Sequence, residues 1–119
     1  MLVFPTQHFN KCGVPSQEVI QKFIFSLESL VELAIENGIE PVLVSTPKHS
    51  RYLAAEPQDV RNVNRMITRR LVEKYRMRFL DYSAMSLNDD CFADADHLNP
   101  YSRKLFTQKL MTDLGYGKP

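Results

Sequence analysis

Residues 34–47 read Ala34-Ile-Glu-Asn-Gly38-Ile-Glu-Pro-Val-Leu-Val-Ser-Thr-Pro47, and this stretch decides the fold class of the chain. From Ile39 to Thr46 it is almost continuously β-branched or aliphatic, which is typical of a strand buried on both faces of a parallel sheet. Pro41 then belongs at the beginning of the strand, where it removes no ladder hydrogen bond. Before the strand, Gly38 supplies the left-handed stop of a helix. The stretch therefore predicts a helix that leads into a buried parallel strand.

Elements of the same two kinds alternate on both sides of this stretch. Apolar residues recur at spacings of three and four after Ser16, which is a suitable N-cap for a helix. In the first half of the chain we expect a helix over residues 17–37, a strand over 39–46 and a second helix that begins at Pro57. In the second half we expect a strand over 77–82, an acidic irregular loop over 83–99 and a last helix from Pro100, with Asn99 as its N-cap. This alternation implies right-handed crossovers between parallel strands and an α/β fold.

The length of the chain, 119 residues, suits one domain. We expect residues 1–15 to be an irregular amino-terminal segment and residues 16–119 to be the folded part. Two strands are few, because sheets usually have about four to six. The sequence therefore predicts a sheet that is incomplete as a monomer and self-association through its exposed edge.

The charge balance excludes one class of partner. The chain has 15 basic and 14 acidic side chains and a net charge of +1, whereas nucleic-acid binding needs a surplus of clustered Lys and Arg. The densest basic stretch places Arg61, Arg65, Arg69 and Arg70 at helical spacing, which is typical of a solvated helix face. We expect no nucleic-acid partner.

The sequence shows neither a membrane anchor nor a secretion signal. The first 15 residues lack a basic start and an apolar run, and no stretch approaches the roughly 18 apolar residues that cross a bilayer. We expect no membrane association and leave the location open, with the cytoplasm as the default. Cys12 and Cys91 match no metal-ligand spacing, and two free thiols are favoured over a disulfide.

The segment with the clearest chemistry is Phe92-Ala-Asp94-Ala-Asp96-His97-Leu98-Asn99-Pro100, between the second strand and the last helix. Asp94 and His97 are three residues apart, so in a loop the carboxylate can accept a hydrogen bond from the imidazole Nδ1–H. Such a bond fixes the ring tautomer and leaves Nε2 to take a proton from a serine hydroxyl. In open α/β sheets the carboxyl ends of the strands form the ligand crevice, and this loop begins at one of them.

The run Asp94-Ala-Asp-His97-Leu-Asn99 resembles the last block of SGNH (GDSL-like) hydrolases, whose Asp and His complete a Ser-His-Asp triad. Residues 34–47 are similar to the helix and fourth strand of that fold, and the similarity covers roughly residues 20–115. The resemblance implies the carboxy-terminal half of a three-layer, flavodoxin-like SGNH fold. It also implies that His97 is the catalytic base and that Asp94 is its orienting acid.

The other blocks of that family have no counterpart here. The chain contains no G-D-S segment for the nucleophile and no G-x-N-D segment for the oxyanion donors. About 38 residues precede the first predicted strand, which leaves no room for the first three strands of the family's five-stranded sheet. We therefore expect a fragment or truncated member of the family that carries the Asp/His pair and is inactive by itself.

Three residues within the chain are alternative nucleophiles. Ser45 ends the first predicted strand and Ser83 follows the second, but neither sits on a G-x-S-x-G elbow. Cys91 lies six residues before His97, and an ordinary loop thiol is the favoured interpretation.

Residues after the first strand are candidates for substrate binding. His49, in Thr46-Pro-Lys-His-Ser-Arg-Tyr52, leaves that strand on the same side as His97, and Tyr52 follows three residues later. Polar side chains of a surface loop are the alternative interpretation. The aspartates of residues 89–96 and the two histidines match neither an EF-hand nor a helical H-E-x-x-H spacing, so we expect no metal and no other cofactor.

Two functions remain open at this point. The first is that of a serine esterase or acyl hydrolase acting on a small-molecule or glycan ester, of which this chain carries the Asp/His pair. The alternative is a non-catalytic remnant or a partner-binding α/β domain.

Overall fold

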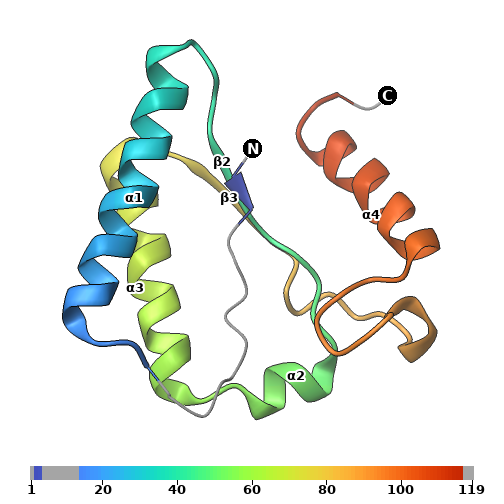
Figure 1. The fold of residues 1–119 in the computed structure, drawn as a ribbon. Helices are drawn as coiled ribbons and strands as arrows, with labels where there is room; N and C mark the ends of the chain where they lie inside the picture. The colour runs from blue at the N-terminus through green and yellow to red at the C-terminus, as the bar shows by residue number, and fades with distance from the viewer. Residues whose placement is uncertain (1, 4–13, 117–119) are drawn as a thin grey trace. The chain divides into compact units, whose positions relative to one another are not determined.

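The computed structural model describes residues 2–3 and 14–116. They form an α/β fold with the element order β1, α1, β2, α2, α3, β3, a short 3-10 helix and α4 (Figure 1). The chain divides into two compact units. The first unit comprises the described part of residues 1–46 together with residues 55–82, and the second comprises residues 47–54 together with the described part of residues 83–119.

The sheet of the first unit has three parallel strands in the order β1–β2–β3, namely Leu2–Val3, Val42–Ser45 and Arg78–Asp81. In the central strand, Leu43 pairs with Leu2 on one side and with Phe79 on the other. The side chains of Leu43 and Val44 are fully buried, as predicted for a strand covered on both faces. The α/β class and the parallel pairing expected from the sequence are confirmed.

The prediction of an irregular segment over residues 1–15 is wrong at Leu2–Val3, which form β1. Two residues are too few to show the periodicity by which a strand is recognised in a sequence. The sheet therefore has three strands instead of the predicted two. Residues 4–13, with Cys12 among them, lie outside the described residues.

Helix α1 (Gln17–Glu36) begins and ends close to where the sequence predicts. The backbone N–H of Val19 donates a hydrogen bond to Ser16 Oγ (3.3 Å), which satisfies a donor of the first turn. After the last turn, Gly38 has a φ of +71°, a left-handed conformation that glycine adopts at no steric cost.

Helix α3 (Gln58–Tyr75) lies beside α1 (Figure 1). Glu28 of α1 binds Arg70 of α3, and one turn further on Glu32 binds Tyr75, so the two helices run in the same direction. This arrangement is expected when successive helices connect parallel strands with the same hand. The two helices and the sheet share one hydrophobic core, which contains Ile20, Ile24, Leu27, Val31, Leu43, Ile67, Leu71 and Met77.

The second unit contains all but the last residue of α2 (Ser50–Ala55), the loop over residues 83–99 and α4 (Pro100–Asp113). Helix α4 begins as predicted, because Asn99 Oδ1 accepts a hydrogen bond from the backbone N–H of Ser102 (2.9 Å). Helix α2 occupies a stretch for which the sequence predicts a loop. Within the described part of the chain, no helix combines the length and the hydropathy that a membrane crossing requires.

Candidate functional site

A small hairpin in the second unit holds the candidate catalytic residues. Phe92 and Leu98 form an antiparallel bridge at its base. Inside the bridge, the backbone N–H of Ala93 donates to the carbonyl of His97 (2.9 Å). Residues 93–97 therefore form a tight loop, and the side chains of Asp94 and His97 lie close to each other on it.

Asn99 joins this hairpin to α4. Its backbone N–H donates to the carbonyl of Cys91 (2.9 Å), and its side-chain amide donates to the carbonyl of Asp90. The same amide group caps α4 through its oxygen. One residue thus fixes the base of the hairpin and the first turn of the helix at the same time.

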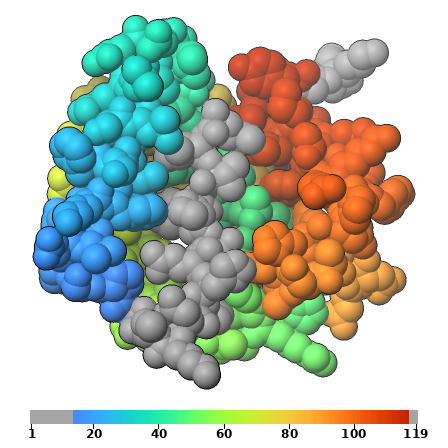
Figure 2. All heavy atoms as spheres, viewed as in Figure 1, coloured from blue at the N-terminus to red at the C-terminus, as the bar shows by residue number. Residues whose placement is uncertain are grey.

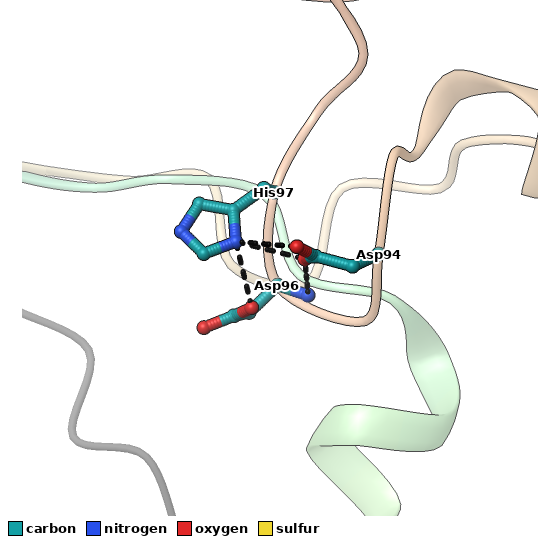
Figure 3. Close-up of side chains that lie close together, drawn as sticks. All are labelled: Asp94, Asp96 and His97. Atoms are coloured by element: carbon teal, nitrogen blue, oxygen red, sulfur yellow. Dashed lines mark hydrogen bonds and ion pairs between the residues drawn. The ribbon is translucent and has the colours of Figure 1, made fainter.

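The imidazole of His97 faces the carboxylate of Asp94 (Figure 3). His97 Nδ1 lies 2.8 Å from Asp94 Oδ1 and 3.0 Å from Oδ2, which are hydrogen-bond distances. The other ring nitrogen, Nε2, points away from the carboxylate in the same view. The pair predicted from the D-x-x-H spacing therefore has the geometry that holds a proton on Nδ1 and presents Nε2 to its surroundings.

Asp96 is a third member of this cluster. Its Oδ1 lies 2.9 Å from His97 Nδ1, and its side chain is only 7% exposed, in contrast to the 58% of Asp94 and of His97. The backbone N–H of Asp96 also donates to Asp94 Oδ1 (3.1 Å). Sequence analysis misses this role, because the side chain that precedes a histidine faces its ring only when the backbone is tightly turned.

The hydrogen bonds of the cluster stabilise the ionised form of Asp94. The backbone N–H of Asp96, and next the imidazole of His97, hold the pKa of the Asp94 carboxyl below its ordinary value of 3.8. Asp94 is therefore a carboxylate at neutral pH and can orient the imidazole and stabilise its charged form.

His49 belongs to a separate cluster of the same unit. Its Nε2 lies 2.7 Å from Asp89 Oδ1, and its ring packs edge-on against Phe92 with 5.3 Å between the ring centroids. The Nδ1 atom accepts a hydrogen bond from the backbone N–H of Arg51 (3.1 Å). These two contacts fit the tautomer with the proton on Nε2, in which Nε2 donates to Asp89 and Nδ1 accepts.

The structure thus places the two candidate histidines in different clusters. The backbone N–H of His49 donates to the carbonyl of Ala95 (3.1 Å), so the start of α2 is tied to the hairpin. Tyr52 lies on α2 three residues beyond His49 and is half-buried. The bond from His49 to Ala95 fits a supporting role for His49, and its role in substrate binding stays a prediction, as does that of Tyr52.

The alternative nucleophiles take part in backbone hydrogen bonds. The carbonyl of Ser45, in the first unit, accepts a hydrogen bond from Tyr82 (2.8 Å), and the carbonyl of Ser83, in the second, accepts one from Lys48 (3.2 Å). Cys91 is a free, half-buried thiol at the base of the hairpin. Neither serine begins a helix, so neither has the helix N-terminus that a nucleophile elbow uses.

Asp94, Asp96 and His97 each offer one metal-ligand atom within 4.8 Å of the others. In the observed arrangement His97 Nδ1 is directed at both carboxylates at hydrogen-bond distance. A metal bound between them would take the place of these hydrogen bonds. The His97 nitrogen that would bind such a metal is the same atom that is hydrogen-bonded to Asp94.

Comparison of the chain with family models, curated proteins and solved structures gives no match.

Proposed function

We propose that this chain is the Asp/His part of an SGNH-like serine ester hydrolase, with His97 as the general base and Asp94 as its orienting acid. The observation that carries the proposal is the 2.8 Å contact between His97 Nδ1 and Asp94 Oδ1, with Nε2 directed away from the carboxylate. A Ser-His-Asp triad needs this orientation of the ring. The hairpin before α4 and the α/β class of the fold support the same proposal.

The chemistry of the pair follows from its geometry. His97 Nε2 takes the proton of a serine hydroxyl as the serine oxygen attacks the acyl carbon of an ester, and it returns that proton to the leaving alcohol. The Asp94 carboxylate stabilises the imidazolium that forms in between. The substrate class is an acyl or acetyl ester of a small molecule or glycan. Because the 119 residues contain no G-D-S segment, the proposal requires a serine from another segment or chain.

The DNA upstream of the Met1 codon provides the test. We expect a G-D-S segment there, in frame or separated by a frameshift. When the joined reading frame is expressed, a fluorophosphonate should label that serine, and hydrolysis of p-nitrophenyl acetate should be lost in the His97→Ala variant. Absence of such a segment, or hydrolysis that is unchanged in His97→Ala, would show that the proposal is wrong.

Partner binding without turnover is a second candidate function. It is favoured by a separate feature of the first unit, a groove between α1 and α3 whose lining includes Arg65, Met66 and Arg69. In this case the Asp94–His97 pair would stabilise the hairpin and would have no catalytic role.

A further inference from the structure

A groove of about 690 Å³ runs between α1 and α3 in the first unit. The Asp94–His97 cluster belongs to the second unit, so the groove is a separate feature. On α3 its lining extends from Asn62 to Lys74, which corresponds to roughly 18 Å of helix. On α1 it is lined by Gln21 and Ile24. The groove is therefore an elongated surface that follows the two helices over about three turns of α3.

The lining of this groove carries uncompensated positive charge. Arg70 and Lys74 both bind the buried Glu28, at 2.6 Å and 2.7 Å. Within the described part of the chain, Arg65 and Arg69 form no ion pair, and Glu73 is the acidic side chain of the lining. Four positive charges thus face two negative charges, and two positive charges remain for a ligand.

Apolar side chains lie next to these charges. Met66, between the two arginines on α3, is 46% exposed, and Phe25 on α1 is 73% exposed. Phe25 lines a neighbouring hollow of about 680 Å³, and Gln21 lines both hollows. Helix α1 (blue to cyan) is open to solvent on the face seen in Figure 2. The surface therefore combines apolar contacts with cationic ones.

We propose that the α1–α3 groove docks an acidic amphipathic helix of a partner protein. Such a helix places its apolar residues against Met66 and Phe25, in the manner of other helices bound in grooves. Carboxylates one turn apart on the same helix reach Arg65 and Arg69, which are themselves one turn apart. A single phosphate group fits this surface less well, since it reaches one end of a groove of this length. The proposal does not depend on ester hydrolysis.

The test uses the full chain and a fluorescein-labelled synthetic peptide of about 16 residues, built from Glu, Leu and Ala with leucines along one helical face. Fluorescence anisotropy should show binding of this peptide and weaker binding as salt is added. A peptide in which Lys replaces every Glu should not bind. Arg65→Glu/Arg69→Glu should lower the affinity about tenfold or more, because two attractive contacts become repulsive.

Two further variants test the specificity of the charge effect and the contribution of the apolar contact. Arg103→Glu/Lys104→Glu makes the same change of charge on exposed positions of α4 and should leave the affinity nearly unchanged. Phe25→Ser should weaken binding without changing its salt dependence. Circular dichroism checks that each variant keeps its fold, since all the changed side chains are exposed.

Four results would overturn the proposal. The first two are that the acidic peptide does not bind, or that the acidic and basic peptides bind equally well. The third is that the α4 control variant loses as much affinity as the Arg65→Glu/Arg69→Glu variant. The fourth is that tripolyphosphate binds as tightly as the peptide. The last result would identify a site for small anions instead of a docking surface.

Discussion

Both carboxylate oxygens of Asp94 lie within 3.0 Å of Nδ1 of His97. Asp96 approaches the same nitrogen from a second direction, at 2.9 Å. The imidazole is thus held by an exposed carboxylate and by a buried one. Because the two carboxylates act on one nitrogen, the loss of either leaves the other to orient the ring.

The first prediction concerns the tautomer of His97 in the neutral ring. In wild type we expect the proton on Nδ1, since this nitrogen is hydrogen-bonded to the Asp94 carboxylate and lies 2.9 Å from Asp96 Oδ1. Asp94→Asn or Asp96→Asn alone should shift part of the population to the Nε2–H tautomer, and the double variant should shift more. Nitrogen-15 NMR of the ring under alkaline conditions measures this. Asp89→Asn, which alters the partner of His49, is the control and should leave His97 unchanged.

The second prediction concerns the ionisation of Asp94. Its pKa lies below the ordinary 3.8, first because of the Asp96 backbone N–H and second because of His97. A depressed pKa contributes stability that is present above the unfolded value and is lost as the pH falls through the lower folded value. In His97→Ala the carboxyl pKa should rise only part of the way toward 3.8, because the backbone donor remains. Carbon-13 NMR titration of the carboxyl group tests this, and a complete return to 3.8 would contradict it.

Much of the fold can be predicted because residues that favour helix ends in the sequence lie at the ends of helices in the structure. Ser16 and Gly38 mark the ends of α1, and Asn99 with Pro100 marks the start of α4. Which apolar residues become buried is harder to predict. Leu30 fits the helical spacing yet is 50% exposed, because α1 has more apolar positions than its contact with β2 and α3 covers.

The candidate site could be predicted only where its residues are close in sequence. The contact between Asp94 and His97 follows from a spacing of three residues, as the hairpin allows. The contact between His49 and Asp89 spans 40 residues and depends on how α2 meets the loop, for which no local pattern exists. Long-range pairs of this kind are set by tertiary structure.

The third prediction concerns the ion pairs between α1 and α3. Hydrogen bonds from Lys74 and then Arg70 hold the pKa of Glu28 below its ordinary 4.5. Glu28→Gln should lower the free energy of unfolding at pH 7 by about 1 kcal/mol, since its two partners are half-exposed and remain solvated.

By the same linkage, the stabilisation from Glu28 is present above its unfolded pKa and is lost as the pH falls below about 4.5 through the folded value. Urea unfolding at several pH values should therefore show a smaller difference between wild type and Glu28→Gln in acid. Glu18→Gln is a matched control, because Glu18 forms an exposed pair with Lys22. Its effect should stay below about 0.5 kcal/mol.

The fourth prediction concerns activity of the chain by itself. The sequence contains no G-D-S segment, and loss of the nucleophile from a triad typically lowers kcat by about 10⁶. We therefore expect the purified chain to hydrolyse p-nitrophenyl acetate no faster than its His97→Ala variant. A fluorophosphonate label on Ser45 or Ser83, together with turnover, would contradict this expectation and identify a nucleophile within the chain.

The last prediction concerns self-association. Among the described residues, β3 pairs with β2 and lies at the end of the strand order, and a strand at the edge of a sheet is a template for the addition of another strand. Phe79 on this strand is 38% exposed. We expect the chain to form dimers or larger species through this edge at high micromolar concentration, as measured by light scattering. Phe79→Lys should reduce the association, because lysine on an edge strand opposes the addition of another strand.

Leu33→Lys separates the sheet edge from other apolar surfaces. Leu33 is 56% exposed on α1, so the change removes a similar amount of apolar surface and adds the same charge. If β3 is the contact, the Leu33 variant associates like wild type whereas the Phe79 variant does not. If instead Leu33→Lys dissociates the chain and Phe79→Lys leaves it associated, the contact lies on α1. A wild-type chain that stays monomeric at high micromolar concentration would mean that the edge of β3 supports no association.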